Sequence, residues 1–230
     1  MIAGFGSHVR ANKWIYYPTC IFLFFRLITL LWMWGIRQVI SQPIYPHPIL
    51  RPYLGVPIEQ NPWLEPWQRW DTLHYQAIAN RGYTAFDSAL FVPPLFPYLM
   101  KTVAILLGGN TLLAGIVISN IAFLFCLIIF YRMTENETKK SDDATRATLY
   151  LASFPASFFF FAAYTESLFL LASLLVIQYT RHEKWWQAGI WGGIASLTRL
   201  PGLLIVVPLI YTALIKWAKE KYGNLGFPLF

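Results

Sequence analysis

The chain has 230 residues, of which 57% are hydrophobic and 13% are charged, with a formal net charge of +7 and a mean hydropathy of +0.47. Ordinary soluble domains carry about 25% charged residues, so this composition excludes that class and indicates an integral membrane protein. The lysines and arginines are scattered between apolar runs and form no long basic block, which argues against binding to nucleic acid. Their charge suits orientation in a bilayer and contact with anionic membrane lipid.

The first predicted span is Trp14–Ile40, an apolar run long enough to cross a bilayer. It is too long for a secretory signal and lacks a cleavage site, so we expect it to remain as an anchor. Arg26 lies in the middle of this span, where an unpaired charge is costly. Two interpretations stay open: Arg26 snorkels or faces a neighbouring helix, or its cation lies near an anionic lipid head.

A long loop outside the bilayer is predicted from Ser41 to Phe91. Its first part, Ser41–Pro66, contains seven prolines and cannot be helical for long. A helix is then predicted over Pro66–Arg81, because proline suits the first turn and Gly82 suits the end. It would be about 24 Å long and is too polar to cross hydrocarbon. We therefore expect a short helix on the membrane surface, with its tryptophans in the headgroup layer.

The segments after the loop are again apolar. Val92–Leu107 is expected to be re-entrant or to lie flat, and Leu112–Tyr131 is a clear span. A last helix, Gly202–Trp217, is expected after a break at Thr198–Pro201.

The run Thr148–Tyr179 is too long for one straight span. As a single helix it would measure about 48 Å, against a hydrocarbon thickness of about 30 Å. Two short arms that meet at Tyr164–Ser167 would place Glu166 at a membrane face, where its charge costs least. Thr165 would then cap the second arm.

Lysines and arginines near the span ends predict the orientation. Those expected on the cytoplasmic side are Arg10, Lys13, Lys139, Lys140, Arg146, Arg181 and Lys184. The loop 41–91, the turn 164–167 and the break 198–201 then lie together on the opposite face. The sequence therefore predicts one extracytoplasmic site built from three separate segments.

Charged and titratable side chains gather on that face. They are Arg69, Asp71, His74, Arg81, Glu166 and Arg199. A carboxylate can act as a general base toward a hydroxyl, and arginines can hold a phosphate through paired hydrogen bonds. With aromatic rings to stack on sugars, this mixture suits sugar transfer from a lipid phosphate to a hydroxyl. No phosphate-binding glycine loop, pair of zinc-binding histidines or nucleophile elbow is present in the sequence.

The first of these segments also has a structural interpretation. Asp71 could pair with Arg69 or Arg81 on the surface of the helix, and His74 could hydrogen-bond along it. A divalent metal held by Asp71 and His74 would need further ligands that the sequence does not offer.

The other candidates have structural interpretations as well. Glu166 could cap a helix or pair within the bundle, and Arg199 could satisfy carbonyls at a helix end. A belt at the membrane interface is the simplest interpretation of Trp63, Trp67, Trp70, Trp185 and Trp186.

Three ordered blocks of the chain carry a family resemblance. They are RWDTLHYQAIANRGY at 69–83 followed by FVPPLFP at 91–97, FPASFFFFAAYTES at 154–167, and LTRLPGL at 197–203. Together they resemble the PIG-V-like mannosyltransferases, relatives of the second mannosyltransferase of GPI-anchor assembly. That family lies within the GT-C class of polytopic glycosyltransferases.

The resemblance implies an all-α polytopic membrane helical bundle of GT-C type. Residues 1–230 would be a single transmembrane domain that forms the N-terminal part of a longer family fold, with residues 41–91 as the extracytoplasmic catalytic loop. The membrane would be the plasma (inner) membrane in a bacterium and the endoplasmic reticulum in a eukaryote.

It also implies a hexosyltransferase with a polyprenyl-phosphate sugar as donor, mannose in the characterised branch, and a hydroxyl of a lipid-linked or glycan acceptor. Asp71 would be the general base of an inverting displacement. No residue is assigned as a metal ligand, although a divalent metal is compatible with the class. The expected substrate contacts are Arg69, Trp70, His74, Tyr75, Arg81, Glu166 and Arg199.

Two other function classes stay open. One is a transporter or flippase for a lipid-linked sugar, in which Arg26 and Glu166 would be charges along the path. Inverted repeats would favour it, and the sequence shows none. The other is a non-catalytic membrane subunit that binds a transferase as its partner.

Overall fold

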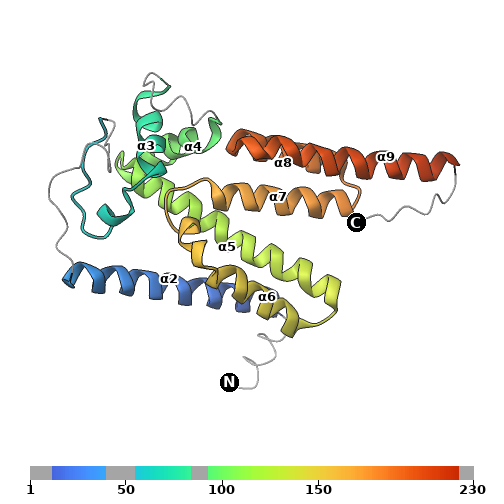
Figure 1. Ribbon diagram of the computed structural model, residues 1–230, viewed down its shortest axis with the longest axis horizontal. Helices are drawn as coiled ribbons and strands as arrows, with labels where there is room; N and C mark the ends of the chain where they lie inside the picture. Colours follow the sequence, from blue (N-terminus) through green and yellow to red (C-terminus); the bar gives the residue numbers. More distant parts are fainter. Residues whose placement is uncertain (1–11, 40–54, 84–92, 223–230) are drawn as a thin grey trace.

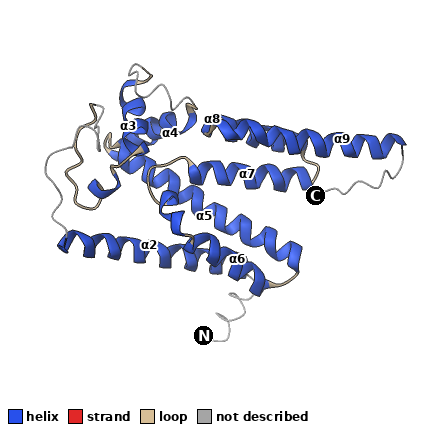
Figure 2. Cartoon of the chain, in the orientation of Figure 1, coloured by secondary structure: helices blue, strands red, loops and turns tan. Residues whose placement is uncertain are grey.

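The computed structural model describes residues 12–39, 55–83 and 93–222. These ranges contain helices and connecting segments without strands, as Figures 1 and 2 show. Within the described ranges, three stretches are long and apolar enough to cross a membrane: Lys13–Val39, Thr111–Thr138 and Leu200–Lys221. The chain is therefore an all-α, multi-pass membrane protein, as predicted. The predicted loop outside 55–83, Arg10 and the residues after 222 lie outside the described residues.

Helix α5 (Thr111–Thr138) is the centre of the bundle. It packs against α2 (Lys13–Val39), α4 (Leu95–Ala104), α6 (Ser141–Ser153) and α7 (Glu166–Arg181). In the most apolar 18 residues of α5, half of the residues are buried by these neighbours. In the most apolar 18 residues of α2, none is buried. The predicted first span is confirmed in α2, and the predicted span 112–131 is confirmed in α5.

Helix α4 is too short to be a full span. It has 10 residues and continues for 3 more as the 3-10 helix η3 (Ile105–Leu107), whereas a helix needs about 20 to cross the hydrocarbon. Gly108, in a left-handed conformation at φ +67°, ends η3. Helix α4 packs against α3 (Asp71–Arg81) and the start of the bundle instead.

The predicted break between two arms is confirmed. After α6 the chain forms the 3-10 helix η4 (Pro155–Phe160), then the irregular segment 161–165, and α7 begins at Glu166. All five residues of 161–165 are buried. Buried irregular backbone is tolerated only where other groups of the protein satisfy its N–H and C=O groups.

Side chains from two other helices satisfy that backbone. From α5, Asn120 donates a hydrogen bond to the carbonyl of Phe161 at 2.9 Å and Ser119 donates to that of Tyr164 at 2.8 Å. From α3, Thr72 donates to the carbonyl of Ala163 at 3.4 Å. The segment 161–165 is therefore the point where α3 and α5 are joined.

The chain turns back after α8 (Trp185–Thr198). Arg199 is extended at φ −147°, and the 3-10 helix η5 (Leu200–Ile205) leads into α9 (Val206–Tyr222). Gly202 allows this close return, because a Cβ there would lie 2.3 Å from the backbone of Ala195. The predicted break at Arg199 is confirmed.

The two ends of the bundle differ in their contacts. At one end the guanidinium of Arg132 lies 4.4 Å over the ring of Trp14, and Arg181 forms an ion pair with Glu137. At the other end, where α3 and α4 lie, Arg37 contacts Glu65. Among the residues that the structure describes, the basic ones that were expected on the cytoplasmic side thus lie at the end of the bundle away from α3 (Figure 1).

Gly115 provides a test of the contact between α5 and the segment 161–165. A Cβ at Gly115 would lie 2.6 Å from Cβ of Ala163 and 3.1 Å from Cε of Met100. We expect Gly115→Ala to destabilise the protein by about 1–3 kcal/mol through overpacking, measured as thermal unfolding in detergent. Gly193→Ala on α8 is the matched control, because nothing lies within 4 Å of its added Cβ. Equal unfolding temperatures for the two variants would contradict this packing.

Candidate functional site

The segment before Asp71 is not part of one long helix. A 3-10 helix, η1, covers Glu65–Trp67, and α3 begins only at Asp71, so the predicted helix over Pro66–Arg81 is wrong in its first third. Trp70 separates the two at φ +47° and ψ −126°, a conformation that costs about 1–3 kcal/mol for a bulky residue. The predicted end is confirmed, since Gly82 at φ +76° donates its N–H to the carbonyl of Ile78 at 2.7 Å.

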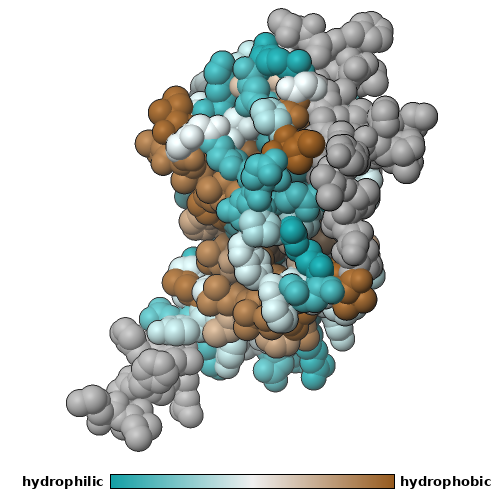
Figure 3. All heavy atoms as spheres, turned by 90° about the vertical axis from the view of Figure 1, so that its left-hand side faces the viewer, coloured by the Kyte–Doolittle hydropathy of each residue, from teal (hydrophilic) through white to brown (hydrophobic). Residues whose placement is uncertain are grey.

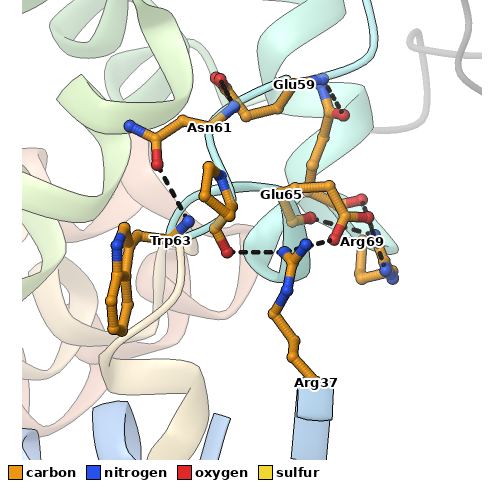
Figure 4. A network of polar contacts seen from close by, with 8 residues as sticks. Arg37, Glu59, Asn61, Trp63, Glu65 and Arg69 are labelled. Carbon is orange, nitrogen blue, oxygen red and sulfur yellow. Dashed lines mark hydrogen bonds and ion pairs between the residues drawn. The ribbon is translucent and has the colours of Figure 1, made fainter. Parts of the chain in front are cut away.

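A polar network holds η1 against the end of α2 (Figure 4). Arg37 donates to the carbonyl of Pro62 at 2.6 Å and lies 3.4 Å from Glu65. Arg69 lies 2.9 Å from the other oxygen of Glu65. The guanidinium of Arg69 is therefore engaged with Glu65 and not with Asp71.

Gln68 holds the same turn from the inside. Its buried amide accepts from the N–H of Glu59 at 3.0 Å, and donates to the carbonyl of Pro57 at 2.8 Å and to the side chain of Gln76 at 3.2 Å. Glu59 in turn accepts from Asn110 at 2.9 Å. The turn before Asp71 is thus fixed to α3 and to the start of α5.

The indole of Trp67 is part of the core. Its side chain is buried and stacks on the ring of Phe161, with 4.3 Å between centroids and 18° between planes. Trp67 is therefore not at the membrane interface as predicted, whereas Trp63, Trp70 and Trp186 are exposed. The two large rings bury each other's faces, and this contact stabilises Trp67 in the core.

Helix α3 is a buried helix. Seven of its eleven residues are buried within the protein, from Thr72 to Ala79. Its apolar side packs on α4, where the ring of Tyr75 meets Phe96 edge-on at 5.3 Å. Its N-terminal end, with Asp71, remains partly exposed, and hydrophilic residues are visible on this end of the molecule in Figure 3.

A hydrogen-bonded chain connects α3 to the break at Arg199. The hydroxyls of Tyr75 and Thr165 share a hydrogen bond of 3.4 Å. Arg199 donates to the hydroxyl of Thr165 at 3.2 Å and forms an ion pair with Glu166. Thr165 occupies the N-cap position of α7, but its side chain makes no capping hydrogen bond, so the predicted capping role is wrong. The Thr165 hydroxyl instead forms hydrogen bonds to Tyr75 on α3 and to Arg199 after α8.

Asp71 lies in the electric field of this ion pair. Partial burial and then the negative charge of Glu166 raise the pKa of Asp71, while His74 and Arg199 act to lower it. The Asp71 carboxylate has no hydrogen bond or ion pair with the residues that the structure describes. The expected alternative, a pair with Arg69 or Arg81, is therefore absent here.

Tyr164 lies beside Asp71 and was not singled out from the sequence. Its hydroxyl lies 3.5 Å from the carbonyl of Arg69, to which it donates. Burial raises the pKa of Tyr164, and burial also raises the pKa of Tyr75 to about 12, so both phenols stay protonated. The sequence offered one signal for this contact. Ser119 and Asn120 are polar residues inside the apolar span of α5, and they donate hydrogen bonds to the carbonyls of Tyr164 and Phe161.

The structure thus brings together Asp71, His74, Tyr75, Glu166 and Arg199. The guanidinium of Arg81 lies elsewhere, against Gly55, and the indole of Trp70 points outward with 64% of its surface exposed. In the described ranges no group of three or more His, Cys, Asp or Glu side chains could hold a metal ion.

Comparisons with known proteins agree with the resemblance of the three blocks. The family model described as Mannosyltransferase (PIG-V) matches residues 18–221. A GPI mannosyltransferase 2 from Drosophila pseudoobscura pseudoobscura is 29% identical over 127 residues. That match covers 51% of this chain and 28% of the relative, so the chain spans little more than a quarter of that protein. No solved structure matches the chain. Because the family match extends over most of the sequence, the chain belongs to the PIG-V mannosyltransferase family.

Proposed function

We propose that this protein transfers a hexose, mannose, from a polyprenyl-phosphate donor to a hydroxyl of a lipid-linked or glycan acceptor. The observation that carries the proposal is the meeting of Asp71, Glu166 and Arg199, which come from three segments far apart in a chain of a mannosyltransferase family. Such a meeting is what a bound sugar phosphate and an acceptor hydroxyl require.

Asp71 is the general base in this proposal. Its carboxylate accepts the proton of the acceptor hydroxyl while that oxygen forms a bond to the anomeric carbon of the sugar. The bond from that carbon to the phosphate oxygen breaks, and polyprenyl phosphate leaves with the electron pair, which inverts the anomeric centre. The raised pKa of Asp71 makes it a stronger base than an exposed aspartate.

The neighbours of Asp71 have complementary roles. Arg199 has five N–H donors, so it can hold Glu166 and also donate hydrogen bonds that stabilise the negative charge of the leaving phosphate. One carboxylate oxygen of Glu166, Oε2, is buried without a partner and can accept from a sugar or acceptor hydroxyl. The outward indole of Trp70 offers a face on which a sugar can stack.

Other substrate contacts remain predictions. Tyr75 and His74 lie on the same turn of α3 as Asp71 and can orient the acceptor. Contacts from Arg69 or Arg81 would require these side chains to leave Glu65 and the surroundings of Gly55. From the distribution of lysine and arginine we expect this site on the extracytoplasmic side, which is the lumen if the membrane is that of the endoplasmic reticulum.

The test is sugar transfer by membranes that contain the protein, with polyprenyl-phosphate mannose labelled in the sugar. We expect label in the acceptor fraction and none with a nucleotide-linked mannose in its place. Intact donor that crosses sealed vesicles without transfer would contradict the proposal in favour of a flippase. The absence of both would favour a non-catalytic subunit.

A further inference from the structure

Arg26 is held inside the bundle by aromatic rings. Its guanidinium carbon lies 5.0 Å from the ring centre of Phe22, 5.0 Å from that of Phe123 and 4.7 Å from that of Phe161. Its Nη2 also lies 3.5 Å from the carbonyl of Phe160, to which it donates. Of the two interpretations of this residue, the structure has the guanidinium facing neighbouring helices. A charge at this depth needs such partners, since little water reaches it.

The ring of Phe161 connects Arg26 to the turn before Asp71. Phe161 stacks on Trp67, with 4.3 Å between the ring centres, while its carbonyl accepts from Asn120. Trp67 ends η1, and the strained Trp70 follows three residues later. Arg26, Phe161 and Trp67 therefore form a continuous stack, here called the Arg26 stack, from the middle of α2 to the turn that carries Asp71.

We propose that Arg26 is a positioning residue that fixes the 67–71 turn through the Arg26 stack. The turn holds an unfavourable backbone conformation at Trp70, which persists only where the surroundings over-determine it. The Arg26 stack constrains this turn at Trp67. The hydroxyl of Tyr164 constrains it at Arg69, by donating a hydrogen bond to the carbonyl of that residue. Loss of the cation beside Phe161 weakens the support that the Arg26 stack gives to this turn.

The ring of Phe22 offers a matched control. It lies as close to Arg26 as Phe123 does, but it belongs to α2 itself and its ring partner is Phe123, at 6.4 Å. Phe161 contacts both Arg26 and Trp67. Phe22→Leu therefore weakens the surroundings of Arg26 without breaking the stack, whereas Phe161→Leu breaks it.

The first experiment measures whether the turn opens. Thr72→Cys, a fully buried probe beside Ala163, is labelled with a maleimide in detergent, in a background of Cys20→Ala and Cys126→Ala. Thr148→Cys, equally buried on α6, reports general loosening. We expect Arg26→Gln and Phe161→Leu each to accelerate labelling of Thr72→Cys roughly tenfold, with Thr148→Cys changed less than about twofold.

Three further outcomes decide the proposal. Arg26→Lys, which keeps a cation, should restore most of the protection, and Arg26→Gln combined with Phe161→Leu should exceed neither single variant. Unchanged labelling in Arg26→Gln would overturn the proposal. Equal acceleration by Phe22→Leu and Phe161→Leu would overturn it as well, because the stack would then not be the route.

The second experiment rests on the proposed function. We expect Arg26→Gln to lower the turnover of sugar transfer by a larger factor than it raises the KM for the donor, because the base is displaced while Arg199, the proposed phosphate contact, lies on another segment. A higher donor KM with unchanged turnover would overturn the positioning role. The labelling result is independent of catalysis, so failure of the proposed function would leave it readable.

Discussion

Asp71→Asn should lower sugar transfer by about 10²–10⁴-fold, the range that a general base contributes. The amide has nearly the shape of the carboxylate but cannot take a proton from the acceptor hydroxyl. The substitution removes no hydrogen bond or ion pair among the described residues. The lost charge at the first turn of α3 changes stability by about 1 kcal/mol at most. Transfer and thermal unfolding of the same membrane preparation give the two readouts.

Asp142→Asn is the matched control for this variant. Asp142 is also an acid in the first turn of a helix, but α6 carries it at the opposite end of the bundle, and its side chain is exposed. Its transfer should remain within about twofold of the unsubstituted protein. Activity of Asp71→Asn within tenfold of the unsubstituted protein would remove Asp71 from the role of base, whatever the family.

The sequence was sufficient to predict two of the spans and the break before α7. Hydropathy and length placed the spans that became α2 and α5, and the excess length of 148–179 required the break that the structure has before Glu166. The distribution of lysine and arginine then brought Asp71, Glu166 and Arg199 to one face. These features depend on solvation by lipid, which acts on each segment separately and is readable from composition.

The details of the site depend on tertiary contacts and could not be read in this way. The positive φ of Trp70 has no local signal, because tertiary contacts of its neighbours hold it, such as those of the buried Trp67 and of the hydroxyl of Tyr164. Pro66 is compatible both with the start of a long α-helix and with the short 3-10 helix that contains it, so it did not distinguish the two. Thr165 looked like a helix cap, yet Tyr75 and Arg199 compete for its hydroxyl.

The ion pair of Glu166 and Arg199 should control the pH dependence of transfer. A base works only when deprotonated, so the rate falls as the pH falls through the pKa of Asp71. The negative charge of Glu166 raises that pKa, and the positive charge of Arg199 lowers it. Glu166→Gln should therefore move the acid limb of the rate profile to lower pH, and Arg199→Gln should move it to higher pH.

The double variant separates the electrostatic role of the pair from its contacts with substrate. With Glu166→Gln and Arg199→Gln together, the raising and lowering effects on Asp71 are both removed, so the acid limb should return toward that of the unsubstituted protein. Its maximal rate should stay roughly 10²-fold lower, because the donor for the leaving phosphate is still missing. Shifts of the limb in the same direction for both single variants would instead indicate a general loss of structure. A normal maximal rate in the double variant would restrict the pair to tuning Asp71 and leave the phosphate to another cation.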